Sequence, residues 1–291
     1  MKFAFIEAQK ARHSVAKLCE LLQVSRSGFY ASRGRKESRR DQANRALLAH
    51  IREAHVSSRR AYGSPRVYFE LRDRGMRVGR NRIARLMKLD GIRARQRRRF
   101  VVTTKSDPGL PVAPNVLARD FRPSEPNRSW AADITYIRTL QGWLYLAVVM
   151  DLYSRRIVGW ATSARMDRQL VLSALAMAVN RRAPSSGLVH HSDQGSQYAS
   201  WDYQKQMKQL GITCSMSRRG NCWDNAVVES FFGTLKAELV YHRHFADRRQ
   251  AHAELFDYIE TFYNPKRRHS ALGYLSPAEF ERRRSSETLA A

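Results

Sequence analysis

The sequence has little cysteine and no long apolar run. Its 291 residues include three cysteines, Cys19, Cys214 and Cys222, at spacings that suggest neither a disulfide framework nor a zinc motif. No apolar stretch approaches the roughly 20 residues of a membrane-spanning helix. The apolar start at residues 3–6 meets Glu7, too early for the core of a signal peptide. These absences exclude disulfide-rich secreted and membrane-embedded classes, and we expect a cytoplasmic protein without a membrane partner.

Acidic residues are also scarce. The chain carries 52 Lys and Arg against 26 Asp and Glu, a formal net charge of +26. Residues 1–100 hold 27 basic and 8 acidic residues, and the rest of the chain holds 25 and 18. A strong positive balance is typical of proteins with a polyanionic partner. The first third therefore resembles a surface that binds nucleic acid.

Two short helices are predicted within residues 14–31. Ser14 and Ser25 are good N-caps, and the apolar residues between them follow helical spacing. This is the outline of a helix-turn-helix, with Arg26 on the helix that would enter the major groove. An ordinary helical hairpin fits the segment equally well.

A second helical segment is predicted over residues 42–91. Ser64-Pro65 favours a helix start, Gly75 a stop, and a further helix runs from about Arg80 to Leu89. A basic helix face is usually solvated surface, but the excess of positive charge across this region favours contact with the DNA backbone. The candidate contacts in this segment are Arg66, Arg80, Arg82 and Arg85.

Residues 92–128 are predicted to be a linker. They contain a run of arginines followed by five prolines, and proline favours extended chain over regular helix. The run gives three further candidate phosphate contacts, Arg97, Arg98 and Arg99, although a flexible basic linker explains it nearly as well.

The pattern changes after residue 128. Residues 130–139, 142–151 and 156–162 are rich in Ile, Val, Tyr and Trp and predict an antiparallel meander. A helix over 167–182, a strand over 188–191, a helix over 201–210, a strand over 212–216 and a helix over 226–239 follow. This element order is that of a ribonuclease-H-like domain with a mixed five-stranded sheet.

Three acids stand where a metal-dependent DNA enzyme needs them. Asp133 lies inside the first strand, Asp193 directly follows the fourth, and Glu229 lies in a helix after 35 intervening residues. An acid within an apolar strand is costly unless it is paired or functional. Convergent carboxylates suit Mg²⁺, and phosphoryl transfer on DNA commonly uses two such ions. Lys236, two helical turns after Glu229, shares its face and is a candidate phosphate contact.

Each acid alone also fits a structural role, and other groups compete with the three. Asp151 fits a turn, and Asp224 fits the start of the last predicted helix. A metal site made from His190, His191, Cys214 and Cys222 matches no zinc spacing. His191 fits either a role beside the acids or simple packing.

Four stretches carry a family resemblance: residues 130–136 (WAADITY), 191–198 (HSDQGSQY), 220–232 (GNCWDNAVVESFF) and 263–274 (YNPKRRHSALGY). Residues 62–67 and the segment around 22–30 fit as well. Through them, nearly the whole chain resembles the integrase-core transposases of bacterial insertion sequences, specifically the second-frame product of the insertion sequence three family.

The resemblance implies a multidomain fold: an α-helical, helix-turn-helix-like DNA-binding region, then an α/β ribonuclease-H-like catalytic core. We divide the chain into residues 1–38 and 39–95 for DNA binding, 96–126 as linker, and 127–285 as catalytic core with carboxy-terminal helices. The family's Asp-Asp-Glu triad falls on Asp133, Asp193 and Glu229, and its following basic position falls on Lys236.

The implied activity is cleavage at the 3′ ends of an insertion sequence and strand transfer by in-line phosphoryl transfer, with two Mg²⁺ per active site and Mn²⁺ as a substitute. The implied partners are double-stranded DNA, both the terminal inverted repeats and the target, and further copies of the chain on paired ends. The implied location is the bacterial cytoplasm, at the nucleoid. Family members often join an upstream-frame product by frameshifting; its heptad pattern is absent here. A retroviral-type integrase, a ribonuclease H and a regulator derived from a transposase are the alternatives.

Overall fold

The structure, a computed structural model, describes residues 1–34, 36–95, 112–218 and 222–290. It divides into two compact units, Met1–Glu53 and Ala54–Ala291. The four-segment division from the sequence stays a prediction beside this one. Among the residues described, none of the helices combines the length and apolar character needed to cross a bilayer.

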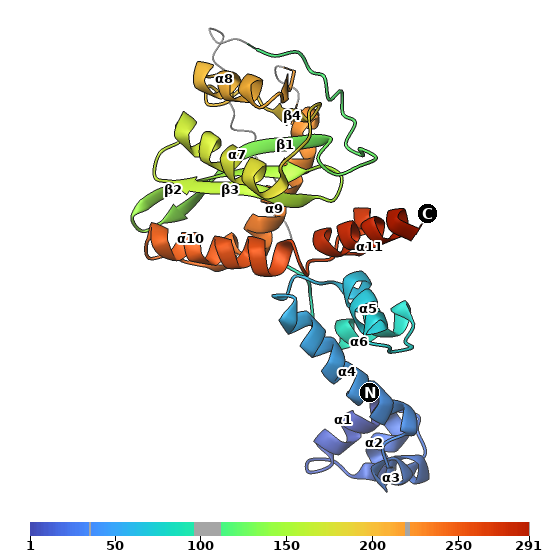
Figure 1. Cartoon of the computed structure of the whole chain (residues 1–291). Coiled ribbons are helices and arrows are strands. Elements are labelled where there is room, and N and C mark those ends of the chain that lie inside the picture. Colours follow the sequence, from blue (N-terminus) through green and yellow to red (C-terminus); the bar gives the residue numbers. More distant parts are fainter. Residues whose placement is uncertain (35, 96–111, 219–221, 291) are drawn as a thin grey trace. The chain divides into compact units, whose positions relative to one another are not determined.

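The first unit is a cluster of short helices (Figure 1): α1 (Lys2–Gln9), α2 (Val15–Leu21), α3 (Arg26–Gly34) and most of α4 (Arg39–Ser57). The predicted caps are present, because Ser14 Oγ accepts from the Lys17 amide at 3.4 Å and Ser25 Oγ from the Gly28 amide at 3.0 Å. Helix α1 was not predicted. Its buried Ile6 joins Leu18, Cys19 and Phe29 in a small core.

The second unit opens with the end of α4, followed by α5 (Ser64–Asp73) and α6 (Arg80–Leu89). Pro65 occupies the first turn of α5, where its missing N–H is harmless. Gly75 has a φ of +81°, the left-handed conformation that ends a helix. Both predictions are confirmed, and the apolar faces of α5 and α6 bury Leu71, Ile83 and Met87.

The centre of this unit is a five-stranded sheet of order β3-β2-β1-β4-β5. The strands are β1 (Ser129–Thr139), β2 (Gly142–Asp151), β3 (Arg156–Ser163), β4 (Val189–Ser192) and β5 (Thr213–Met216). The first three pair antiparallel, whereas β4 pairs parallel with both β1 and β5. The predicted mixed sheet of a ribonuclease-H-like domain is confirmed.

Helices cover both faces of the sheet. Figure 1 shows α7 (Arg168–Arg182) and α8 (Trp201–Gln209) on one side and α10 (Arg248–Phe256) on the other, while α9 (Ala226–Glu238) packs against β1. Helix α7 approaches β3 closely at Gly159, where a Cβ would lie 2.2 Å from the Ala174 carbonyl oxygen. The core between α7, α8 and the sheet includes Trp130 and Val149.

The carboxy-terminal segment contains a π-helix (Asp257–Tyr263) and α11 (Pro277–Ala290), with 3-10 turns at Cys222–Asn225, Val240–His242 and Ser270–Leu272. Asn264 ties the segment to the start of β3: its Oδ1 accepts from the Ile157 amide and its Nδ2 donates to the Ile157 carbonyl, each at 2.9 Å.

The carboxy-terminal segment also contacts α5. The Arg268 guanidinium donates to Glu70 at 2.9 Å and to Asp73 at 2.7 Å, and the Tyr274 ring stacks on Phe69 with centroids 4.1 Å apart. These contacts tie the helices of the second unit to the part of the chain that follows the sheet.

Candidate active site

Two of the predicted acids lie on neighbouring strands. Asp133 stands in β1, where its Oδ1 accepts from the Ile134 amide at 2.7 Å. Because β4 runs parallel to β1 with Ala131 opposite His191, Asp193 leaves the end of β4 at the level of Asp133. Asp193 Oδ1 accepts from the Gly195 amide at 3.0 Å, which closes a tight turn after the strand.

Helix α9 brings the third acid. Asn225, directly before α9, donates from Nδ2 to the Ala132 carbonyl at 3.1 Å and so fixes the helix start against the backbone beside Asp133. Glu229 follows one turn later and is half-buried. Two turns farther on, Lys236 places Nζ 4.8 Å from the centre of the Tyr136 ring. The sequence analysis assigned Asn225 no role, although it lies inside a quoted family stretch.

The electrostatics show that the acids act on one another. Burial raises the pKa of Asp133 well above its usual range, and the charges of Asp193 and Glu229 raise it further. Burial also raises the pKa of Asp193, and burial together with the charge of Asp193 raises the pKa of Glu229. Burial lowers the pKa of Lys236, against the opposing effect of Asp133. The site is thus a cluster of disfavoured negative charge.

A divalent cation fits this cluster in chemistry. Carboxylate oxygens are the hard ligands that Mg²⁺ prefers, and a cation between them would relieve both the burial and the repulsion. Within the described part of the chain, however, no three His, Cys, Asp or Glu side chains are grouped tightly enough to form a metal cage. The acids are brought into electrostatic range without being closed into a preformed site.

Tyr198 is a further residue of this site that the sequence analysis did not single out. It is buried in the loop between β4 and α8, and its hydroxyl has no hydrogen-bond partner among the described residues. Burial raises the pKa of Tyr198 well above its usual range, with smaller contributions from Tyr203, Asp133 and Asp193. Its place at the end of the quoted stretch 191–198 was the available signal.

The competing acids have structural partners. Asp151 is fully buried, accepts from the Asn127 and Tyr153 amides, and pairs with Arg182 at 3.1 Å. Asp224 lies in the 3-10 turn before α9, as its position predicted, and pairs with Arg119 at 2.8 Å and Arg218 at 2.9 Å. Despite burial, hydrogen bonds from Arg218 and Arg119 hold the pKa of Asp224 well below its usual range.

The two histidines of β4 are packed. His190 bonds to the Tyr203 hydroxyl at 3.1 Å, and His191 bonds to the Ser215 and Ser217 hydroxyls at 2.9 and 3.1 Å. Burial lowers the pKa of His190 to about 3 and of His191 to about 4, so both stay neutral at pH 7. Of the two roles left open for His191, simple packing describes this structure.

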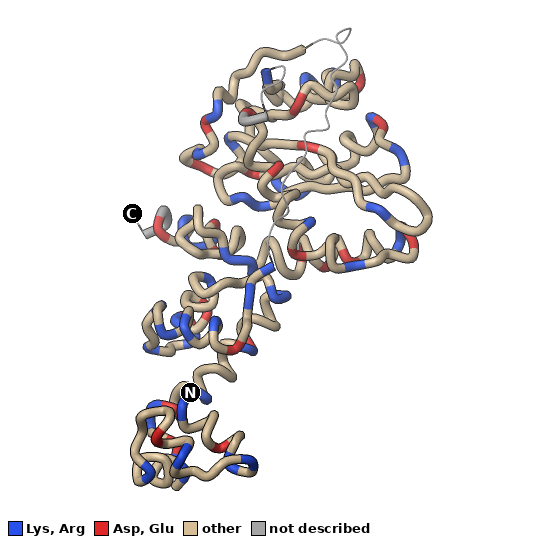
Figure 2. The backbone as a smooth tube through the Cα atoms, turned by 180° about the vertical axis from the view of Figure 1, so that it is seen from behind, with Lys and Arg blue, Asp and Glu red and all other residues tan. Residues whose placement is uncertain are grey.

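The predicted DNA contacts differ in exposure. Arg26, Arg80 and Arg85 are exposed, whereas Arg82 is half-buried. Arg66 instead has an internal partner: its Nε donates to the Arg268 carbonyl at 2.9 Å and its guanidinium lies over the Tyr62 ring. Figure 2 marks Lys and Arg along the helical segments as well as in the sheet domain. Three predicted contacts, Arg97, Arg98 and Arg99, lie outside the described residues.

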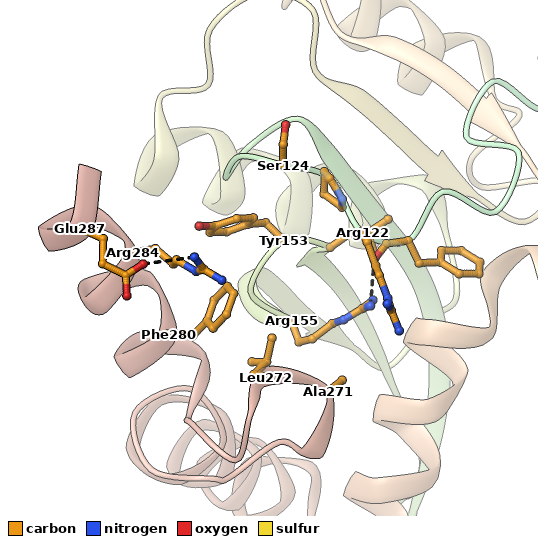
Figure 3. A pocket seen from close by; sticks show the side chains of 12 residues that line it. Arg122, Ser124, Tyr153, Arg155, Ala271, Leu272, Phe280, Arg284 and Glu287 are labelled. Carbon is orange, nitrogen blue, oxygen red and sulfur yellow. Dashed lines mark hydrogen bonds and ion pairs between the residues drawn. The ribbon is translucent and has the colours of Figure 1, made fainter. Parts of the chain in front are cut away.

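A cleft away from the acids lies at the turn between β2 and β3. Its volume is about 780 Å³, and Figure 3 shows Tyr153 and Phe280 facing it, with Arg155 hydrogen-bonded to the Phe121 carbonyl. Of its described lining residues the one acid, Glu287, pairs with Arg284 at 3.1 Å. The cleft therefore lacks the acid cluster that marks the candidate active site.

Comparison with known proteins places these features in one family. Two models described as integrase core domain match residues 123–222 and 210–277, and a model described as HTH-like domain matches residues 42–100. "Transposase InsF for insertion sequence IS3A" of Escherichia coli (strain K12) is 44% identical over 283 residues, 97% of this chain and 98% of the relative. The chain belongs to the IS3 family of transposases. It is also 47% identical to "Insertion element IS600 uncharacterized 31 kDa protein" of Shigella sonnei, over 90% of this chain and 97% of that one.

The transposase is thus an enzyme with an integrase catalytic core, and its helix-turn-helix-like match falls on residues 42–100 rather than on the pair α2–α3. Among solved structures, the catalytic core domain of HTLV-2 integrase in complex with magnesium aligns with 55% of this chain and 99% of that chain, at a TM-score of 0.42 and 16% identity. A simian T-cell lymphotropic virus intasome chain aligns over 61% of each chain, at a TM-score of 0.46 and 19% identity.

Proposed function

We propose that this transposase cleaves DNA at the 3′ ends of its insertion sequence and transfers the freed ends to target DNA, using Asp133, Asp193 and Glu229. The observation that carries the proposal is the convergence of these acids from β1, the end of β4 and α9, with a raised pKa for each. Clusters of acids whose pKa values are raised by burial and mutual repulsion are typical of functional sites, because both effects oppose ionisation.

The cofactor in this proposal is Mg²⁺, two ions per site, with Mn²⁺ as a substitute. Bound there, the metal would supply charge neutralisation and an activated oxygen nucleophile. The three acids would hold it, and the hydrogen bonds that the two aspartates accept from the Ile134 and Gly195 amides would orient them for that task. Lys236, beside Asp133, would hold the phosphate that is cut.

The helical segments would hold the DNA duplex. Arg26, Arg80 and Arg85 are exposed basic side chains on helices, as contact with phosphates requires. The proposed DNA partners are the ends of the element and the target duplex. The proposed protein partners are further copies of the chain on paired ends and an upstream-frame product.

A cleavage assay tests the activity. Duplexes carrying the sequences that flank the gene are incubated with Mg²⁺ and wild type, Glu229→Gln or Glu125→Gln. Glu125 is a matched control, since it is exposed and pairs only locally with Arg128 at 3.0 Å among described contacts. We expect wild type and Glu125→Gln to free and join 3′ ends, and Glu229→Gln to bind DNA but to lose at least about a hundredfold in rate. A regulator derived from a transposase would bind without cutting in all three forms.

A further inference from the structure

Two large aromatic side chains stand half-exposed on the β1–β2 hairpin. Tyr136 in β1 is 41% exposed and Trp143 in β2 is 45% exposed. Their rings meet edge to face, with centroids 5.1 Å apart and planes at 81°. Because β1 pairs Tyr136 with Tyr145 and Arg138 with Trp143, both rings belong to the same face of the hairpin. Adjoining exposed aromatic side chains that are rimmed by polar residues are typical of interaction surfaces.

Cations flank this pair. Lys236 places its ammonium 4.8 Å from the centre of the Tyr136 ring, and the exposed Arg138 stands directly opposite Trp143 in the ladder. We call Tyr136, Trp143, Arg138 and Lys236 the aromatic strip. Aromatic faces interleaved with cations are the composition of surfaces that bind unpaired nucleic acid, since rings stack on bases while cations meet the phosphates. A purely apolar protein partner would leave both cations desolvated.

Lys236 links the rings of the aromatic strip to the active site. Tyr136 lies three residues after Asp133 on β1, about 10 Å along the chain, so the two side chains leave opposite faces of the strand. Lys236 lies on the helix that carries Glu229, contacts the Tyr136 ring, and its charge acts on Asp133. A DNA strand whose phosphate lies at the acids and that runs past Lys236 therefore reaches the strip within about three nucleotides.

We propose that the aromatic strip stacks an unpaired base of the DNA strand, within about three nucleotides of the phosphate that is cut. The inference rests on the proposed function, because it places that phosphate at Asp133, Asp193 and Glu229. The strip favours element ends whose terminal pairs are opened, and so aligns the strand for cutting. Stacking on one aromatic side chain corresponds to roughly a ten- to hundredfold gain in affinity for the opened end.

Binding measurements in an uncut complex test this. The full chain carries Glu229→Gln, and its Kd is measured by fluorescence anisotropy for paired element-end duplexes and for duplexes with one mismatch at each of the three positions on either side of the junction. We expect tighter binding at one or two of these positions. Trp143→Leu and Tyr136→Leu should remove the preference, whereas Trp143→Phe and Tyr136→Phe should keep most of it.

Trp201→Leu is the matched control, since Trp201 is 81% exposed on α8; it should leave the preference unchanged. Thermal unfolding of each variant confirms that the hairpin is intact. The inference is overturned if the Leu variants fold normally and keep the preference, or if they change the number of subunits and not the DNA preference, which would make the strip a protein interface. Failure of the proposed function looks different: wild type would not cut, whatever the mismatch preference.

Discussion

At the scale of single residues, ionisation of Asp133 costs the metal-free fold stability. Its pKa is raised above the unfolded value, first by burial and then by the charges of Asp193 and Glu229. A raised carboxyl pKa means that ionisation subtracts stability as the pH rises through the folded pKa. The acids proposed to serve the chemistry therefore oppose the fold as they ionise.

Replacing Asp133 by Asn should stabilise the metal-free protein while abolishing cleavage. In EDTA at pH 7.5 we expect the melting temperature of Asp133→Asn to exceed that of wild type by roughly 2–4 °C, a change typical of about 1 kcal/mol in a domain of this size. Added Mg²⁺ should raise the melting temperature of wild type and not of the variant. A lower melting temperature for the variant in EDTA would contradict the destabilising role of the charge.

The buried His190 should make the fold less stable at low pH, independently of the three carboxylates. Burial lowers its pKa from 6.5 to about 3. Between these values the unfolded chain binds a proton at His190 and the folded chain does not. Stability should fall as the pH drops below about 6.5, and this residue contributes a slope of at most about 1.4 kcal/mol per pH unit. Urea unfolding between pH 4 and 7 should show a shallower slope for His190→Gln than for wild type. Equal slopes would show that His190 is protonated in the folded protein.

At the scale of elements, Gly159 sets the distance between β3 and α7. A methyl group there would lie 2.2 Å from the Ala174 carbonyl oxygen and 2.7 Å from the Ala178 nitrogen, both backbone atoms. We expect Gly159→Ala to lower the free energy of unfolding by about 3 kcal/mol, at the upper end of overpacking effects. Gly79→Ala is the control, because a Cβ there meets nothing within 4 Å. Similar unfolding curves for the two variants would show that the helix moves away freely.

The elements also show how far the sequence could be followed. Helical spacing predicted α6, and a run of strand-forming residues predicted β2, each at its observed ends, because those signals are local. Helix α1 was missed, since residues 3–6 were weighed only as a signal peptide. The carboxy-terminal π-helix was not predicted either.

Interactions between residues far apart in the sequence could not be predicted, because they leave no local signal. Asp224 depends on Arg119, 105 positions earlier, and Asn225 on the backbone of Ala132. The order strand, strand end and helix singled out the three acids as candidates, because a known topology turns positions along the chain into neighbours. The structure brings them within electrostatic range, and their catalytic role stays a prediction. No such rule predicted Tyr198 or the internal role of Arg66.

At the scale of the whole molecule, Arg268 joins helix α5 to the carboxy-terminal segment of the same unit. Its side chain is 13% exposed and donates to Glu70, Asp73 and the Tyr274 carbonyl. We expect Arg268→Ala to destabilise the second unit by roughly 2 kcal/mol, since it leaves the partly buried Glu70 and Asp73 with their longer pairs to Arg74 and Arg72, at 3.4 and 3.6 Å. Hydrogen exchange of the α5 amides should accelerate. Arg283→Ala, which removes an exposed pair within α11, should leave exchange in α5 unchanged.

DNA binding should depend on salt through the exposed arginines. Removing one cation that neutralises a phosphate lowers the slope of log K against log salt by about 0.9. We expect Arg80→Ala and Arg85→Ala each to reduce the slope by about that amount. Arg66→Met should not reduce it, because the Arg66 guanidinium is directed to the Arg268 carbonyl. The assignment of these roles is wrong if Arg66→Met lowers the slope as much as the other two.

The order of the elements along the chain is also an order in time. Synthesis begins at the amino end, so the basic helices α1–α6 leave the ribosome before β1, and Glu229 follows on the order of ten seconds later. The acids meet only when β4 has paired with β1 and α9 has docked, and such long-range pairing is slow. We expect an interrupted copy to hold DNA without the means to cut it. Truncated chains would then compete with complete copies for the same DNA ends and inhibit them. They would not cut DNA at unselected sites.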